Sequence, residues 1–126
     1  MSVHFDPVTG KLTGEGVVVT ERCVKDLAGV FKDESARQAL DQDKVLYRVE
    51  AFEPVPEGQL GGVGLATTYL MPGQVGDEYF LTRGHYHLNE DRPELEVTIS
   101  GEGYLVLMDR DRVTRIELMT PGSVHP

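Results

Sequence analysis

The sequence predicts an all-β fold, an antiparallel jelly-roll sandwich or barrel with one or two short peripheral helices. Short stretches rich in β-branched and aromatic residues follow one another from residue 45 onward, with turn residues between them and no helical segment. Fourteen glycines and seven prolines supply the turns that such a fold requires. The 126 residues suffice for one compact domain, which we expect to comprise an N-terminal arm with short helices at 1–44 and barrel strands at 45–126.

The N-terminal third has weak strand patterns and one helical segment. Residues 1–20 alternate loosely and are interrupted by glycines, which favours turns and short extended pieces, typical of an edge strand or an arm. Residues 25–42 form the only plausible helical region. Asp33 can cap a short helix that runs through Ala39 and Leu40, whereas Gly29 weakens any longer helix.

The remaining two thirds of the chain alternate between apolar strand patterns and turns. Asp109, Arg110 and Asp111 fit the tip of a hairpin between two such patterns. The expected strand regions are 45–55, 62–73, 77–87, 95–109 and 113–122.

Composition excludes several classes of function. The net charge of -9 argues against general binding of nucleic acid or of an anionic membrane, because both need a basic face, although a small anion remains compatible with it. No stretch approaches the ~20 apolar residues of a membrane span, and the N-terminus has no export signal. Cys23 has no cysteine to pair with and is expected to be a buried apolar side chain. We therefore expect a soluble, cytoplasmic protein.

Two of the four histidines, His85 and His87, stand one residue apart. In a strand, residues i and i+2 face the same way, so the two imidazoles form half of a potential metal site. A carboxylate from the next strand, Glu94 or Glu96, would supply a third ligand. The alternative is an ordinary solvated strand face. His4 and His125 are interpreted as surface residues.

The surrounding pattern resembles a known metal motif. Gly-His-x-His, a short loop, Glu94 and then Gly101 seven residues later resemble the first metal motif of the cupin superfamily, and this resemblance selects His85, His87 and Glu94, not Glu96, as ligands. The stretch before it resembles the cupin-type phosphoglucose isomerases. The positions that match the pattern of this family are Thr68, Pro72, Gly73, Gly76, Glu78, Thr82, Gly84, His85 and His87. The likeness covers most of residues 45–124.

The resemblance implies a metal-dependent isomerase that interconverts glucose 6-phosphate and fructose 6-phosphate. It assigns the phosphate to Thr68, Thr82 and the backbone N–H of Gly84, and it places Tyr47 near the sugar. Strict alternation would put Thr82 and Gly84 opposite the two histidines, so a bend at Gly84 is needed to bring them together. The family also implies a homodimer.

Glu94 has a second candidate role beside the metal. It is the ligand that can also carry a proton, which makes it our candidate for the general base, with a role as a ligand alone as the alternative. Two imidazoles and a carboxylate suit one divalent ion of Fe, Mn, Ni, Co or Zn, and the residue types do not choose among them. They also do not choose between proton transfer and hydride shift.

Two departures from the family pattern keep other functions open. Glu96 stands where the family usually has tyrosine, and the second cupin motif opens at Gly122, four residues before the sequence stops, so that His125 lies too early to be its metal ligand. We therefore expect a shortened chain with an incomplete barrel, or a site completed by water or a partner. The alternatives are a non-catalytic sugar- or metal-binding cupin and another cupin enzyme, such as an epimerase or a dioxygenase.

Overall fold

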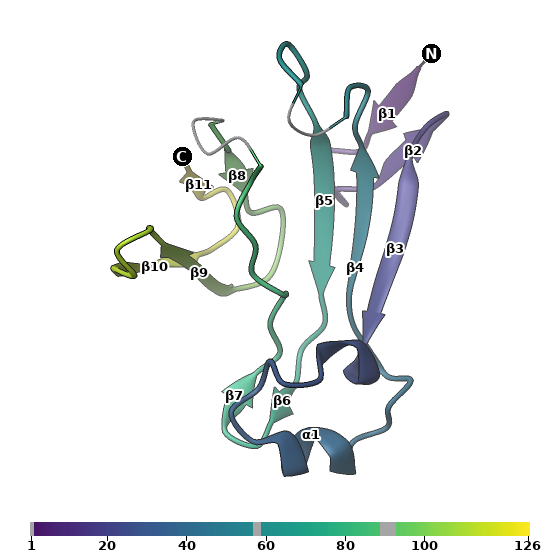
Figure 1. Ribbon diagram of the computed structural model, residues 1–126. Coiled ribbons are helices and arrows are strands. Elements are labelled where there is room, and N and C mark those ends of the chain that lie inside the picture. Colours follow the sequence, from purple (N-terminus) through teal and green to yellow (C-terminus); the bar gives the residue numbers. More distant parts are fainter. Residues whose placement is uncertain (1, 57–58, 89–92) are drawn as a thin grey trace. The chain divides into compact units, whose positions relative to one another are not determined.

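A computed structural model describes residues 2–56, 59–88 and 93–126. The described chain consists mostly of strands with very little helix, which confirms the predicted all-β class (Figure 1). It divides into two compact units. The first unit comprises Met1–Phe5 and Lys11–Glu90, and the second comprises Asp6–Gly10 and Asp91–Pro126. The predicted single domain with a division at 44/45 is not tested by this partition and stays a prediction.

The first unit is built on an antiparallel sheet of three strands. Its order is β3 (Val18–Cys23), β4 (Val45–Phe52) and β5 (Leu65–Leu70), so β4 is the central strand (Figure 1). Two further strands, β1 (Val3–Phe5) and β2 (Leu12–Gly14), pair as a separate ribbon. Of the two expected forms, an edge strand or an arm, the structure shows an edge strand, since β3 lies at the edge of the three-stranded sheet.

The helices lie at the end of the sheet where β4 begins (Figure 1). They are the 3-10 helix η1 (Val24–Leu27) and α1 (Glu34–Ala39). The Asp33 carboxylate accepts the Ala36 N–H at 2.8 Å, which confirms Asp33 as the predicted N-cap. Arg37 is buried, and its guanidinium donates to the Glu34 carboxylate at 2.7 and 2.9 Å and to the Val24 carbonyl at 2.9 Å. This arginine therefore ties α1 to η1.

The core of the first unit lies at the same end of the sheet. Its buried members are Val24, Leu27, Phe31, Leu46, Tyr47, Val75 and Phe80. The hairpin of β6 (Gln74–Val75) and β7 (Glu78–Tyr79) contributes Val75 and leads directly to Phe80. Glu78 accepts the Lys32 N–H at 2.6 Å, so the family position Glu78 has a structural role here.

Gly73 and Phe80 make a close contact beside this hairpin. The Phe80 N–H donates to the Gly73 carbonyl at 2.9 Å, and a Cβ added at Gly73 would lie 2.4 Å from the Phe80 ring. Gly73 also has a φ of +153°, a backbone conformation that side chains disfavour. Glycine at this position of the Pro-Gly turn therefore lets an aromatic ring pack directly on the backbone.

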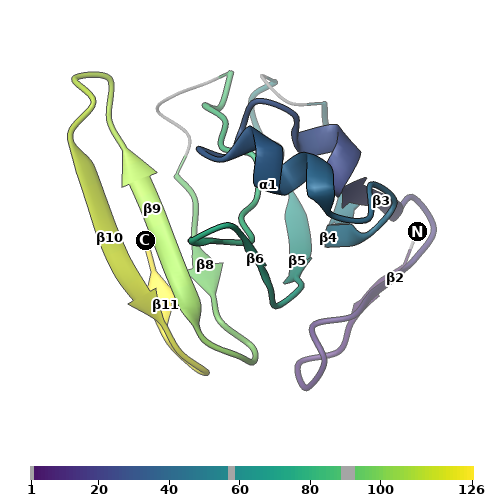
Figure 2. The same ribbon diagram turned by 90° about the horizontal axis from the view of Figure 1, so that it is seen from below.

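The second unit contains a hairpin and a short ladder (Figure 2). In the hairpin, β9 (Gly103–Met108) pairs with β10 (Thr114–Met119), and in the ladder β8 (Glu96–Val97) pairs with β11 (Val124–His125). The Asp109 carboxylate accepts the Val113 N–H at 2.9 Å, and residues 110–111 form a turn. This confirms the predicted hairpin tip.

Two predicted strands are shorter than expected. The strand expected over 77–87 is observed only as β7, and residues 80–88 have no regular secondary structure. The one expected over 95–109 is broken by a bend at Ser100 and Gly101, where Gly101 has a φ of 80°. Closure of the strands into a barrel is not seen among the pairings of the described residues and stays a prediction. Within the same residues, no helix is long and apolar enough to cross a membrane.

Candidate functional site

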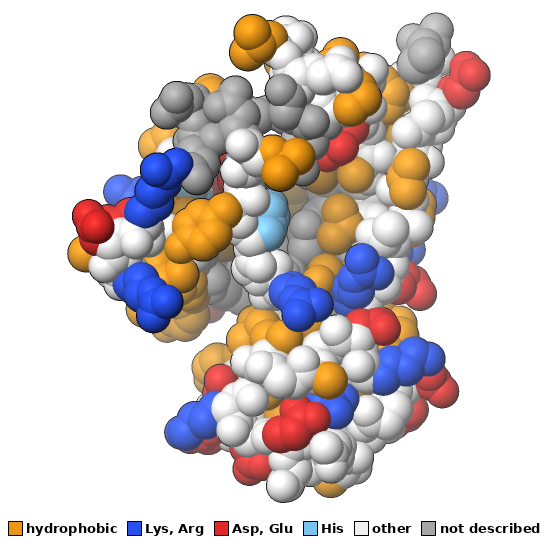
Figure 3. Space-filling view, in the orientation of Figure 1, with side chains coloured by type: hydrophobic (Ala, Val, Ile, Leu, Met, Phe, Trp, Pro, Cys, Tyr) orange, Lys and Arg blue, Asp and Glu red, His pale blue; other side chains and the backbone are white. Residues whose placement is uncertain are grey.

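His85 and His87 lie in the irregular segment of residues 80–88. Their ring centroids are 5.1 Å apart with an interplanar angle of 74°, and His85 is exposed while His87 is half-buried. A patch of histidine surface, coloured pale blue, is visible in Figure 3. Two imidazole nitrogens that each lie about 2.0–2.1 Å from one ion would place their ring centres roughly 4–5.5 Å apart. The two side chains therefore have a separation that fits two ligands of one metal ion, although the predicted strand is absent.

Glu94, the third predicted ligand, belongs to the second unit, whereas the two histidines belong to the first. In the described part of the chain, no group of three or more His, Cys, Asp or Glu side chains is gathered as a metal site. The complete ligand set of His85, His87 and Glu94 therefore stays a prediction. Glu94 is exposed, and Glu96 is half-buried two residues further on.

The environment of Glu96 differs from that of a surface carboxylate. Burial, and next the nearby charge of Glu94, raise the pKa of Glu96, whereas His125 acts in the opposite direction. His125 lies opposite Glu96 in the β8–β11 ladder. The residue that replaces the usual family tyrosine is thus a carboxyl group with a raised tendency to hold its proton.

The predicted phosphate and sugar residues all belong to the first unit. In the sheet register Tyr47 pairs with Leu70 and Val49 pairs with Thr68, so Tyr47 and Thr68 lie on the same face of β4 and β5. The Arg83 N–H donates to the Tyr47 hydroxyl at 3.4 Å. Because of this contact, the segment that carries Thr82 and Gly84 lies next to the Tyr47 hydroxyl.

Those two residues, Thr82 and Gly84, are exposed on either side of Arg83. A Cβ built at Gly84 would have no atom within 4 Å, so there is open space beside this residue. Tyr47 itself is only 8% exposed and belongs to the core cluster. The resemblance predicts Tyr47 near the sugar, and the structure shows it as a core side chain whose hydroxyl contacts the Arg83 N–H.

A polar cluster that the sequence did not indicate lies on the other face of the same sheet. Glu50, only 3% exposed, accepts hydrogen bonds from the Leu12 N–H at 2.8 Å, from Arg48 at 2.8 Å and from the Tyr69 hydroxyl at 3.3 Å. The Arg48 guanidinium also lies 4.7 Å from the centre of the Tyr69 ring. Spacing of i and i+2 puts Arg48 and Glu50 on one face, but nothing in the sequence points to Leu12.

His125 is buried, which corrects its interpretation as a surface residue. Its Nδ1 contacts the Glu117 carboxylate, and its Nε2 lies 2.9 Å from the Ser123 hydroxyl. The hydrogen bond with His125, and next the charge of Arg115, lower the pKa of Glu117. Burial of His125 follows from its place in β11, whose ladder with β8 the sequence did not predict.

Ser123, His125 and the Glu117 carboxylate are connected in the order of a catalytic triad. The Ser123 hydroxyl, however, already uses all of its hydrogen-bonding capacity within the protein. Ser123 Oγ accepts the Thr120 N–H at 3.0 Å and lies 3.0 Å from the Thr98 hydroxyl, in addition to its contact with His125. One proton and two lone pairs serve three partners, so no lone pair remains for attack on a substrate. This hydrogen-bond network around Ser123 therefore stabilises the β8–β11 ladder.

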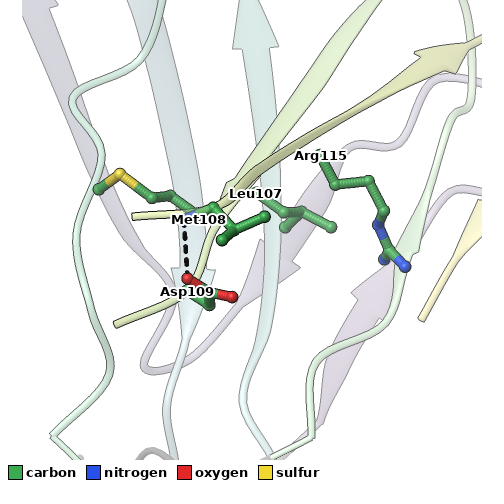
Figure 4. Close-up of a pocket in the computed structure, with 5 residues that line it drawn as sticks. Leu107, Met108, Asp109 and Arg115 are labelled. Carbon is green, nitrogen blue, oxygen red and sulfur yellow. Dashed lines mark hydrogen bonds between the residues drawn. The ribbon is translucent and has the colours of Figure 1, made fainter. Parts of the chain in front are cut away.

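Cys23 is half-buried and not fully buried as expected, and it has no disulfide. A shallow, open hollow of about 400 Å³ lies along the β9–β10 hairpin (Figure 4). Its lining consists of Leu107, Met108, Asp109, Val113 and Arg115 and includes none of the predicted site residues. The two charged lining residues, Asp109 and Arg115, lie apart from each other in Figure 4, so the hollow has no set of converging polar groups.

Comparisons with known proteins give one consistent result. A family model described as glucose-6-phosphate isomerase (GPI) matches residues 21–120. The chain is 39% identical over 125 residues to a glucose-6-phosphate isomerase of Thermococcus onnurineus, covering 98% of this chain and 64% of that protein. It is 37% identical over 126 residues to that of Pyrococcus abyssi, covering 98% and 65%. The corresponding protein of Sinorhizobium medicae is 41% identical over 108 residues, covering 81% and 50%. The chain thus spans less than two thirds of the length of these relatives.

Proposed function

Because this chain belongs to the glucose-6-phosphate isomerase family, we propose that it interconverts glucose 6-phosphate and fructose 6-phosphate with the help of a divalent metal ion. The observation that carries the metal-dependent form of this proposal is the His85–His87 pair, whose ring centroids are 5.1 Å apart. The two neighbouring imidazoles supply the nitrogen donors that suit a transition metal. The named relatives support the isomerase activity itself.

In this proposal His85, His87 and Glu94 hold the metal. A bound divalent ion supplies Lewis acidity, which stabilises negative charge on the C1 and C2 oxygens of the sugar in either a proton-transfer or a hydride-shift route. The donor set accommodates Fe, Mn, Ni, Co or Zn. A test with each ion is therefore part of the proposal.

Glu94 is the residue that we propose as the general base. Its carboxylate would take a proton from one carbon of the C1–C2 pair and return it to the other, while a hydroxyl proton moves in the same direction between the two oxygens, so that the sugar gains and loses no proton overall. A role as a metal ligand alone is the alternative. The Glu94→Gln substitution separates the two only when metal binding is measured together with turnover.

The phosphate group of the substrate is assigned to neutral donors. The hydroxyls of Thr68 and Thr82 and the N–H of Gly84 are suitable hydrogen-bond donors to phosphate oxygens. Support comes from the Tyr47–Arg83 contact, which holds residues 82–84 near a hydroxyl on the face that also carries Thr68. Such a site needs no cluster of lysines, which agrees with the acidic composition.

We also propose that two copies associate and that the protein works in the cytoplasm, where phosphorylated sugars are found. Association is supported by the face of the β9–β10 hairpin with Tyr104, Val106, Ile116 and Leu118, which are 57–64% exposed. An apolar face of this kind is typical of an interaction surface. Sedimentation measures whether two copies associate. A single monomeric species at micromolar concentration, in both the unaltered chain and Val106→Glu, would count against association.

A non-catalytic sugar- or metal-binding protein is the second candidate. The observation that favours it is Glu96, a half-buried carboxyl group where the family usually has tyrosine. Such a protein would bind metal and phosphorylated sugar without turnover. This candidate differs from the first in one measurable quantity, the rate of isomerisation.

The experiment measures fructose 6-phosphate isomerisation after chelation and again after each divalent ion is restored. Activity should depend on metal and should fall at least 100-fold in His87→Ala and Glu94→Gln. His4→Ala is the matched control, because His4 is an exposed histidine of β1. The Pyrococcus abyssi relative serves as the positive control. Metal binding without turnover would favour the binding protein, whereas neither binding nor turnover would refute both candidates.

A further inference from the structure

Tyr47 combines a fixed ring with a hydroxyl that contacts the backbone of another segment. The ring is buried among the core residues on the central strand β4. Its hydroxyl accepts the Arg83 N–H at 3.4 Å. Leu81, two residues earlier, packs partly buried against the same core. The start and the middle of the irregular segment of residues 80–88 are thus both held against rigid parts of the first unit.

The bonded amide lies between the two residues of this segment that are proposed to hold phosphate. A peptide group is planar, so a hydrogen bond on the Arg83 N–H orients the whole Thr82–Arg83 peptide plane. Residues 80–88 have neither helix nor strand, so ladder geometry does not set the orientation of this plane. The open space beside Gly84 leaves the adjoining backbone accessible to a ligand.

We infer that Tyr47 is a positioning residue for phosphate binding and that it acts by holding the Arg83 amide. This inference rests on the proposed function for the assignment of phosphate to Thr82 and Gly84. A hydroxyl that accepts a backbone N–H and is attached to a buried ring is well suited to hold a loop in one conformation. The length of the bond, 3.4 Å, indicates a weak contact, so its effect on binding should be moderate.

The test replaces Tyr47 with phenylalanine, which removes the hydroxyl and keeps the ring. Inorganic phosphate is the probe, and its dissociation constant is measured by calorimetry with or without any turnover. The loss of one neutral hydrogen bond should weaken phosphate binding about 2- to 10-fold. The KM for fructose 6-phosphate should rise by a similar factor, while kcat and the affinity for divalent metal stay within about twofold.

Tyr69→Phe is the matched control. Tyr69 lies on the neighbouring strand β5, and its hydroxyl contacts Glu50 on the opposite face of the sheet, so its removal should leave phosphate affinity unchanged. The backbone amide signal of Arg83 should shift in Tyr47→Phe and not in Tyr69→Phe, which confirms that the altered contact is the intended one.

Three results would overturn the inference. Unchanged phosphate affinity in Tyr47→Phe would show that the hydroxyl does not position the loop. A fall in kcat with unchanged phosphate affinity would indicate direct contact with the reacting part of the sugar. No phosphate binding by the unaltered chain would remove the assigned site, and the metal-dependent isomerisation would still be decided by its own assay.

Discussion

Substitution of Gly73 by alanine should destabilise the first unit through a single identifiable contact. The added methyl group would lie 2.4 Å from the ring of Phe80, which is 4% exposed and therefore cannot swing into solvent. Forcing an extra methyl into a packed core costs about 1–3 kcal/mol. A residue with a side chain at a φ of +153° adds about 1–2 kcal/mol of backbone strain. The expected loss is about 2–5 kcal/mol in the free energy of unfolding.

Urea unfolding, followed by circular dichroism, measures this loss as a fall of roughly 1–2 M in the midpoint. Gly84→Ala is the matched control, since no atom lies within 4 Å of the added Cβ and its φ is not positive. The control should change stability by less than about 1 kcal/mol. Equal midpoints for the two variants would refute the reasoning. A smaller Phe80→Leu side chain should relieve part of the loss at Gly73, with a coupling energy of about 0.5–3 kcal/mol.

Three further predictions concern hydrogen bonds and core packing that stabilise the first unit. The Arg37 hydrogen bond, and next that from the Gly29 N–H, lower the pKa of Glu34 to about 2, so its stabilising effect should be complete above about pH 4.5 and lost as the pH falls towards 2. Glu34→Gln should remove that part of the pH dependence of the urea midpoint, and an unchanged profile would contradict the assignment. Glu50→Leu should speed amide exchange at Leu12 by at least tenfold in hydrogen-exchange NMR, because this N–H loses its buried acceptor. Leu46→Ala, at a fully buried position, should cost about 2–5 kcal/mol, and a loss below 1 kcal/mol would argue against the described core.

The parts of the fold that the sequence predicted correctly are those set by local chemistry. Asp33 caps α1 because a carboxylate at this position satisfies a helix N–H whatever packs around it. The tip of the β9–β10 hairpin depends on Asp109 and the turn that follows it, within a few residues. The central strand β4 was indicated by its alternation of residue types.

What the sequence did not predict depends on contacts between distant segments. The pattern of residues 77–87 favours a strand, but regular pairing ends after Tyr79. The buried Glu50 needs Leu12 as its partner, 38 positions away, and no local pattern encodes such a pair. The local sequence predicts a surface position for His125, but its burial depends on contacts with Glu117 and Ser123. The histidine pair was predicted correctly in its proximity, although the segment that carries it is not a strand.

The contact between Leu12 and Glu50 also constrains the timing of folding during synthesis. A ribosome that adds about 5–20 residues per second needs about 2–8 s to make the chain between the two residues. Throughout that interval the Leu12 N–H has no protein acceptor at Glu50 and must be satisfied by water or by a temporary partner. The ribbon of β1 and β2 can therefore make this contact only after β4 has been synthesised, although the ribbon precedes β4 in the sequence.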